Sequence, residues 1–160
     1  EFDYLLGEGI LSKNDTTDSV IDAIATGCYE DARKSVEAAK ATLDVLSARY
    51  PMVLVSNFYG NIQAVLDDFK LTSYFPVVIE SAVVGVRKPD PAIFRLGVEA
   101  LALQPEEVVV IGDSYRKDIQ PAQSLGCDTI WIKGAGWDDS EAAVQHDKII
   151  TDIAQLQELL

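Results

Sequence analysis

The feature of this sequence that most constrains its fold is an alternation of short apolar runs and amphipathic stretches after residue 51. The apolar runs are typical of buried strands, and the stretches between them carry apolar residues at helical spacing. We expect strands at 52–55, 77–79, 108–111, 129–132 and 148–150, and helices at 61–69, after Asp90-Pro91, before Leu125-Gly126 and at the C-terminus. Because strands that alternate with helices form parallel sheets, the pattern predicts an α/β fold with a doubly wound parallel sheet.

Helical patterns also precede this alternation. The stretch 15–18 offers side-chain oxygens for an N-cap, and Gly27 is a typical helix stop. A second helix is expected from Glu30 to Arg49, ending before Pro51. Residues 1–14 show no clear pattern.

Composition narrows the classes of partner. The 160 residues are 48% hydrophobic, which suits one globular domain, and the formal net charge of −13 disfavours nucleic acid and anionic membranes. No membrane span or signal peptide is visible, so we expect a cytoplasmic protein. Cys28 and Cys127 are expected to be reduced and buried.

Polar residues lie after two of the expected strands, either directly at the strand end or in the loop that follows. Ser56 and Asn57 come directly after 52–55, where a hydroxyl and free backbone N–H groups suit an anion; the alternative is an ordinary helix cap. Lys88 precedes Pro89 in a segment that prolines keep extended. It is either a ligand for a phosphoryl oxygen or a solvated cation.

Two acids follow the strand at 108–111, which we expect to be fully buried. Asp113 and Asp118 lie five residues apart across the turn and the start of the next helix. Paired carboxylates at the carboxyl edge of a parallel sheet suit Mg²⁺, which prefers oxygen ligands. The alternatives are an N-cap role for Asp113 and a solvated helix position for Asp118.

Together these segments, in this order, resemble the haloacid dehalogenase (HAD) superfamily over residues 29–160. Val53-Leu54-Val55-Ser56-Asn57 is similar to its second motif, Lys88 with Pro89 to its third, and Gly112-Asp113-Ser114 with Asp118 to its fourth. The resemblance implies a HAD-like Rossmannoid core and a magnesium-dependent phosphatase acting on a small phosphorylated substrate.

The resemblance also implies roles for individual residues. An aspartate nucleophile would attack a phosphoryl group, and water would then hydrolyse the aspartyl-phosphate. Ser56 and Asn57 would bind the phosphoryl oxygens, and Lys88 would neutralise charge on them. Asp113 would ligate Mg²⁺, with Asp118 as a ligand or an anchor behind it.

The chain departs from the family pattern in one respect: it has no Asp-x-Asp-x-Thr motif at the end of an apolar strand. In this family that strand is the first and lies in the middle of the sheet. We therefore expect a truncated enzyme whose sheet lacks its central strand. Because this leaves strand edges without partners, the chain should be strained, rearranged, homo-oligomeric or paired with the absent N-terminal segment. Alone, the chain is expected to be inactive and to bind Mg²⁺ weakly.

The domain prediction follows from the same resemblance. Residues 1–28 would be the remnant of a helical cap, and 29–160 the core. Three alternatives remain: a noncatalytic phosphate- and magnesium-binding module, a mutase or dehalogenase on the same fold, and a receiver domain. Against the receiver domain, such domains are shorter and carry their acidic pair near the N-terminus, whereas here the pair comes late. The acid pair argues against dehalogenation, which needs no metal.

A few further residues complete the predictions. Trp131 is expected in the core, Trp137 at the rim of the site or away from ligand, and His146 at the surface. Tyr115 and Arg116 either touch substrate or fill their loop.

Overall fold

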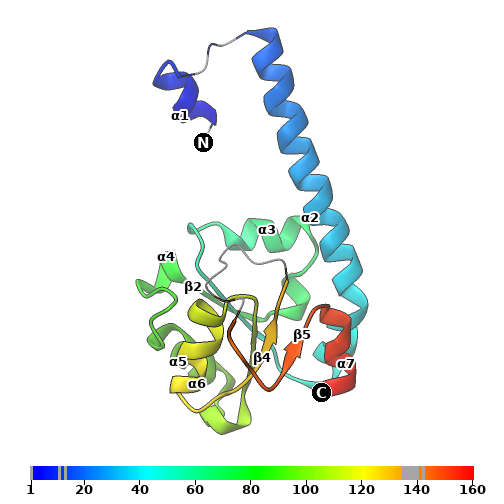
Figure 1. Cartoon of the computed structure of the whole chain (residues 1–160), viewed down its shortest axis with the longest axis vertical. Helices are drawn as coiled ribbons and strands as arrows, with labels where there is room; N and C mark the ends of the chain where they lie inside the picture. The colour runs from blue at the N-terminus through cyan, green and yellow to red at the C-terminus, as the bar shows by residue number, and fades with distance from the viewer. Residues whose placement is uncertain (1, 11, 13, 135–140, 142) are drawn as a thin grey trace. The chain divides into compact units, whose positions relative to one another are not determined.

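The computed structural model describes residues 2–10, 12, 14–134, 141 and 143–160 (Figure 1). The chain forms two compact units, Glu1–Ala38 and Ala39–Leu160, and the division falls inside one long helix. The predicted division into 1–28 and 29–160 stays a prediction.

The first unit is helical. It contains α1 (Phe2–Gly7) and the first part of α2 (Asp15–Arg49). In the first turn of α2 the Thr17 N–H donates to Asn14 Oδ1 (2.9 Å), just before the helix. The prediction of two helices separated at Gly27 is therefore wrong. An interior glycine costs a helix only about 1 kcal/mol relative to alanine, which long helical stretches on both sides offset.

In its described residues, the second unit contains five short parallel strands. They are β1 (Val53–Ser56), β2 (Val77–Glu80), β3 (Val109–Gly112), β4 (Asp128–Ile132) and β5 (Ile149–Ile150). The α-helices are α3 (Ile62–Asp68), α4 (Ser81–Val84), α5 (Ala92–Leu101), α6 (Gln120–Ser124) and α7 (Leu156–Leu159). A π-helix, η3 (Tyr115–Ile119), links β3 to α6, and 3₁₀ turns lie at η1 (Thr72–Tyr74), η2 (Pro105–Glu107) and η5 (Ile153–Gln155). The predicted α/β class is confirmed, and each strand begins or ends within about two residues of its predicted position.

The strands form two sheets rather than one. β1 pairs with β2, with Val53 opposite Val77, while β3, β4 and β5 form the second sheet in that order, with Val109 opposite Asp128. Among the described residues no strand pairs with the other edge of β1 or of β3. This arrangement is the one expected of a sheet without a central strand.

The open edges change the burial of the strands. β3 is only half-buried, and the side chain of Ile111 is 36% exposed. The prediction that 108–111 is fully buried is therefore wrong, because no described strand covers that edge.

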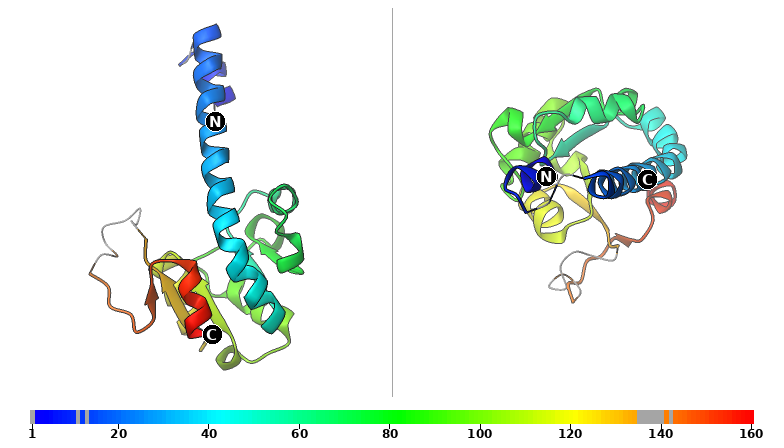
Figure 2. Two further views of the ribbon diagram at one scale, coloured as in Figure 1. Left: turned by 90° about the vertical axis from the view of Figure 1, so that its right-hand side faces the viewer. Right: turned by 90° about the horizontal axis from the view of Figure 1, so that it is seen from above.

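Helices pack on both faces of the second sheet, as a doubly wound fold requires. On one face, Leu46 of α2 and Leu156 of α7 form a cluster with Ile130 and Ile150, and the views in Figure 2 show α7 beside the C-terminal part of α2. Helix α5 packs on the other face. Its buried Ile93 and Phe94 contact valines of β1 and β2 and also Val110 of β3.

The two cysteines differ in their surroundings. Both are free thiols, but Cys28 is exposed on α2, so its predicted burial is wrong, whereas Cys127 is buried as predicted. Burial, and to a smaller extent the nearby Glu106 carboxylate, raises the pKa of the Cys127 thiol above its ordinary value. Among the described helices, none combines the length and the apolar character that a membrane crossing requires.

Candidate active site

The loop after β1 and the loop that carries Lys88 are joined by one side chain. The Asn57 amide nitrogen donates to the Lys88 carbonyl oxygen (3.0 Å), and the Asn57 amide oxygen accepts from the Lys88 N–H (2.8 Å). Asn57 thus fixes the backbone of the lysine, a contact that the sequence did not predict. Ser56 lies half-buried at the carboxyl end of β1.

Lys88 links this loop to the second sheet. Its Nζ lies 2.6 Å from Asp118 Oδ1, and the side chains are 18% and 5% exposed. Both oxygens of Asp118 are engaged, because Oδ2 accepts from the Ser114 N–H (3.1 Å). A short charge-assisted contact therefore joins the predicted third and fourth motifs across the gap between the sheets.

Asp113 has a different environment. It follows β3 directly and is exposed, and no other described residue donates a hydrogen bond to its carboxylate. Its backbone is held instead, because the Trp131 indole N–H donates to the Asp113 carbonyl oxygen (3.0 Å). Trp131 itself is 1% exposed, which confirms its predicted place in the core.

Gly112 is what allows Asp118 to reach the end of β3. A Cβ at position 112 would lie 2.3 Å from the Asp118 Cβ and 2.7 Å from its Cγ, so no larger residue fits. Only a glycine at this position leaves room for the Asp118 carboxylate at the end of β3.

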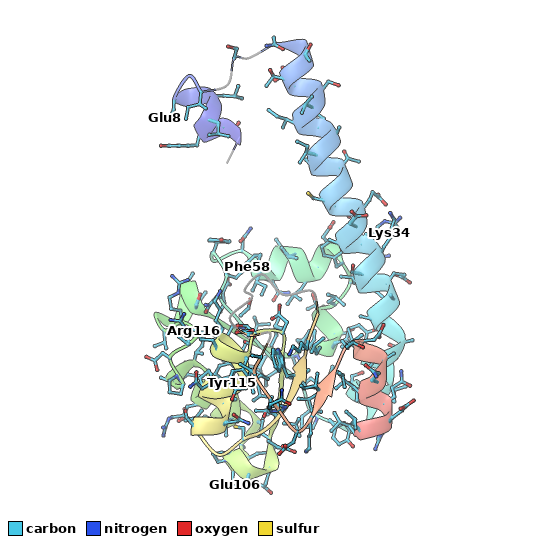
Figure 3. All side chains as sticks on the ribbon, in the orientation of Figure 1. Glu8, Lys34, Phe58, Glu106, Tyr115 and Arg116 are labelled. Carbon is cyan, nitrogen blue, oxygen red and sulfur yellow. The ribbon has the colours of Figure 1, made fainter. Side chains whose placement is uncertain are left out.

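The turn between the two acids is a π-helix, a rare form that is frequent at functional sites. Tyr115 and Arg116, labelled in Figure 3, occupy its first two positions, and the Tyr115 ring packs against Trp131 with centroids 5.4 Å apart. Glu141 binds the same turn through three hydrogen bonds. Sequence reasoning missed Glu141, which lies in a segment without a pattern.

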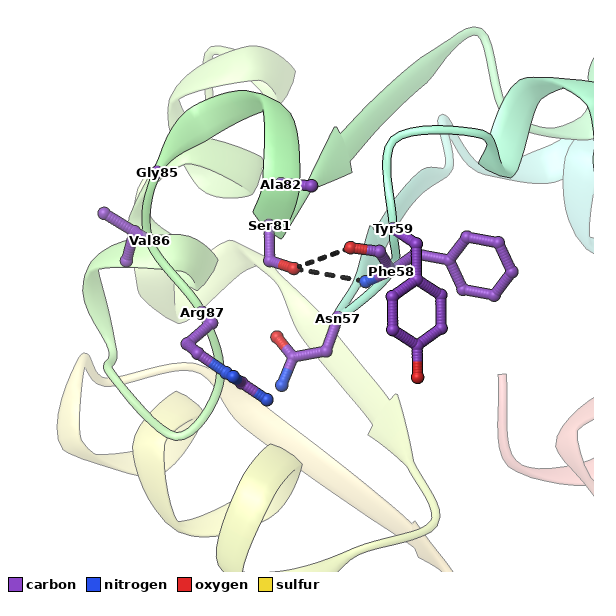
Figure 4. A pocket seen from close by; sticks show the side chains of 8 residues that line it. All are labelled: Asn57, Phe58, Tyr59, Ser81, Ala82, Gly85, Val86 and Arg87. Atoms are coloured by element: carbon purple, nitrogen blue, oxygen red, sulfur yellow. Dashed lines mark hydrogen bonds between the residues drawn. The ribbon is translucent and has the colours of Figure 1, made fainter. Parts of the chain in front are cut away.

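A pocket of about 400 Å³ lies at the loop after β1 (Figure 4). Its lining includes Asn57, Phe58, Tyr59, Ser81 and Arg87, and the Ser81 hydroxyl bonds to both the N–H and the carbonyl of Phe58. Sequence reasoning missed this pocket. The available signal for the pocket was the position of Ser81, a polar residue that comes shortly after the predicted strand at 77–79.

The donor set fits a magnesium ion only in part. The exposed Asp113 carboxylate has the oxygen chemistry that Mg²⁺ prefers, whereas the engaged Asp118 suits an anchoring role behind it. No group of three or more His, Cys, Asp or Glu side chains is arranged to hold a metal in the part of the chain that the structure describes. Further oxygen ligands would have to be water, substrate or residues from another segment.

Of the two other residues in the prediction, only one can be placed. His146 is half-buried rather than at the surface, because its Nε2 lies 2.9 Å from Thr129 Oγ1 of β4. Trp137 lies outside the described residues.

Comparison with known proteins agrees with this arrangement. The profile of the haloacid dehalogenase-like hydrolases matches residues 6–126, which is most of the chain. The chain belongs to the haloacid dehalogenase-like hydrolase family. This membership confirms the predicted family, while the roles of Ser56, Lys88, Asp113 and Asp118 stay predictions.

Curated HAD relatives match in part. The chain is 36% identical over 93 residues to the glyceraldehyde 3-phosphate phosphatase of Pyrococcus furiosus, covering 57% of this chain and 39% of the relative. It is 30% identical over 141 residues to haloacid dehalogenase-like hydrolase domain-containing protein 3 of Mus musculus, covering 83% of this chain and 56% of the relative. The chain thus spans about half the length of these relatives, or less.

A solved HAD structure is also similar. The HAD phosphatase of Thermococcus onnurineus superposes with a TM-score of 0.63 at 28% identity, covering 79% of this chain and 54% of that one. The α/β fold of the second unit is therefore that of the HAD family.

Proposed function

We propose that the complete protein is a magnesium-dependent phosphatase that hydrolyses a small phosphorylated metabolite through an aspartyl-phosphate. The observation that carries this proposal is the buried contact between Lys88 Nζ and Asp118 Oδ1 near the end of β3, the strand that the exposed Asp113 follows directly. It brings one cation and two acids to the carboxyl edge of parallel strands, where ligands bind in open α/β sheets. Similarity to a glyceraldehyde 3-phosphate phosphatase supports a small phosphate ester as the substrate.

In this proposal the residues of the chain bind and orient the phosphoryl group. The Ser56 hydroxyl and the Asn57 backbone N–H donate hydrogen bonds to phosphoryl oxygens, and Lys88 offsets their negative charge. The Asn57 side chain holds the lysine backbone in place, and Asp118 holds its ammonium group.

Asp113 and water would hold the magnesium ion, with Asp118 behind them. When bound, the ion supplies positive charge that lets an anionic nucleophile approach an anionic phosphoryl group.

The nucleophilic aspartate belongs, in this proposal, to a strand that pairs between β1 and β3. Its carboxylate attacks phosphorus as the bond to the leaving oxygen breaks, and a neighbouring acid protonates that oxygen. Water then cleaves the acyl-phosphate, which releases inorganic phosphate and restores the carboxylate. The open edges of β1 and β3 support this placement. The 160-residue chain alone is accordingly inactive.

The test measures phosphate release from a panel of small phosphate esters by the complete polypeptide that the gene encodes. We expect activity with Mg²⁺ that EDTA abolishes, and a fall in kcat/KM of about 100-fold or more for Asp113→Asn and for Lys88→Gln. Asp147→Asn and Lys70→Gln, which alter exposed residues of the same types, are the matched controls.

Three results would contradict the proposal. These are no phosphate release from any ester, activity unchanged by EDTA, and an Asp113→Asn variant as active as the control Asp147→Asn. The first of them would favour a noncatalytic binding module of the same fold.

A further inference from the structure

Glu141 makes an unusually complete set of contacts with the turn after β3. Its Oε1 accepts from the Ser114 hydroxyl (3.1 Å) and the Arg116 N–H (2.9 Å), and its Oε2 accepts from the Tyr115 N–H (3.1 Å). One carboxylate thus binds donors on three consecutive residues, although it lies 25 to 27 residues away in the sequence. Carboxylates that accept from backbone N–H groups form the stronger class of hydrogen bond.

The turn that Glu141 binds is the segment that separates Asp113 from Asp118. It begins the π-helix η3, and the first N–H groups of a helix have no partner within the helix itself. Glu141 supplies acceptors for two of these groups, those of Tyr115 and Arg116. The conformation of the turn therefore depends on a side chain from outside it.

Ser114 transmits this contact to the buried acid. Its hydroxyl donates to Glu141 and accepts from the Lys117 N–H (3.2 Å), while its own N–H donates to Asp118 Oδ2 (3.1 Å). The rotamer and the backbone of Ser114 are thus fixed from both sides. A shift of Ser114 would move the partner of Asp118.

The other end of the turn is held separately. The Trp131 indole N–H fixes the Asp113 carbonyl oxygen, and this contact does not involve Glu141. Removing Glu141 would therefore free the turn after Asp113 while β3 and the Asp113 backbone stay in place.

We propose that Glu141 is a positioning residue that fixes the spacing of Asp113 and Asp118 for magnesium. This inference rests on the proposed function, because it assigns Glu141 to the same metal site. Glu141 does not touch the metal; it acts through the Ser114–Arg116 backbone. Residues behind the direct ligands of a metal commonly affect its affinity by 10-fold or more when they are replaced.

The experiment compares two substitutions of Glu141 that separate position from charge. Glu141→Gln removes the charge and one acceptor oxygen, and Glu141→Asp keeps the charge but shortens the reach of the carboxylate. Glu99→Gln, which changes an exposed glutamate on α5, is the control for loss of one negative charge. All are made in the complete polypeptide.

Two readouts are measured without substrate: Mg²⁺ affinity by calorimetry, and amide hydrogen exchange at Tyr115 and Arg116. We expect both Glu141 variants to bind Mg²⁺ about tenfold more weakly and to lose exchange protection at these two amides. Glu99→Gln should match the wild type in both. In the phosphate-release assay, saturating Mg²⁺ should restore most of the kcat of the variants.

Several outcomes would overturn the inference. If Glu141→Asp binds Mg²⁺ like the wild type while Glu141→Gln does not, the effect is one of charge alone. If exchange at Tyr115 and Arg116 rises without any change in Mg²⁺ affinity, the contact is only structural.

Failure of the proposed function is distinguishable from failure of this inference. A wild type that binds Mg²⁺ but hydrolyses no ester contradicts the phosphatase proposal, while the Glu141 variants still decide the inference. A wild type that binds no Mg²⁺ contradicts both.

Discussion

At the scale of single residues, the site depends on a close approach between Gly112 and Asp118. We expect Gly112→Ala to lower the free energy of unfolding by about 1–3 kcal/mol, because the new methyl group would lie 2.3 Å from the Asp118 Cβ. Urea denaturation measures the change. Gly134→Ala is the control, since a Cβ there meets no atom within 4 Å. Equal stabilities of the two variants would show that Asp118 moves aside freely.

Single residues also show how far local patterns reach. Lys88 and Asp118 were predicted as site residues from their order and their proximity to strand ends; the structure places their side chains in contact, and their roles stay predictions. Glu141 was not predictable, because its partners lie 25 to 27 residues away and its segment has no periodicity. The role of the Asn57 side chain was missed for a related reason: its partner is a backbone group, which every residue carries.

At the scale of elements, an ion pair joins β4 to the segment before β5. Lys148 Nζ contacts Asp128 Oδ2, and this hydrogen bond holds the pKa of the Asp128 carboxyl below its ordinary value. A carboxyl with a lowered pKa in the folded state stabilises the fold above the pKa of the unfolded chain. The stabilisation is lost as the pH falls through the folded-state pKa.

We therefore expect Asp128→Asn to lower the free energy of unfolding at pH 7 by no more than about 1 kcal/mol, because both side chains are nearly half exposed. The difference from the wild type should shrink as the pH falls below about 4. Urea denaturation at several pH values, with Asp147→Asn as the control, measures it. A difference that grows in acid would contradict this assignment.

Elements also show the limits of local patterns. The strands were predicted within about two residues because apolar runs bounded by turns define them. The break at Gly27 was wrong, since propensity is a weak term beside the packing and length of a helix. The π-helix was not foreseen, because the acceptors for its first N–H groups come from Glu141, which lies outside the helix.

At the scale of the whole molecule, one edge of β1 and one edge of β3 have no strand paired to them among the residues that the structure describes. Unpaired edges favour strand addition between molecules, so we expect the 160-residue chain to associate as its concentration rises. Ile111→Lys should weaken this association about fivefold, equivalent to about 1 kcal/mol, because a lysine on an edge strand opposes pairing.

Light scattering coupled to size-exclusion chromatography measures the association. Val83→Lys is the control, because Val83 lies on α4 and is 73% exposed. A chain that stays monomeric throughout, or a control that is affected as strongly as Ile111→Lys, would show that these edges are not the contact.

Helix α5 packs against both sheets, and this has a practical consequence. Its Phe94 shares a cluster with Val55 of β1 and Val110 of β3, so apolar packing links the two strands to each other although no backbone ladder joins them. We therefore expect the chain to bind a synthetic peptide that has the sequence of a matching strand, because both neighbouring strands are already in place. Adding or withholding such a peptide would then test the proposed phosphatase activity one segment at a time.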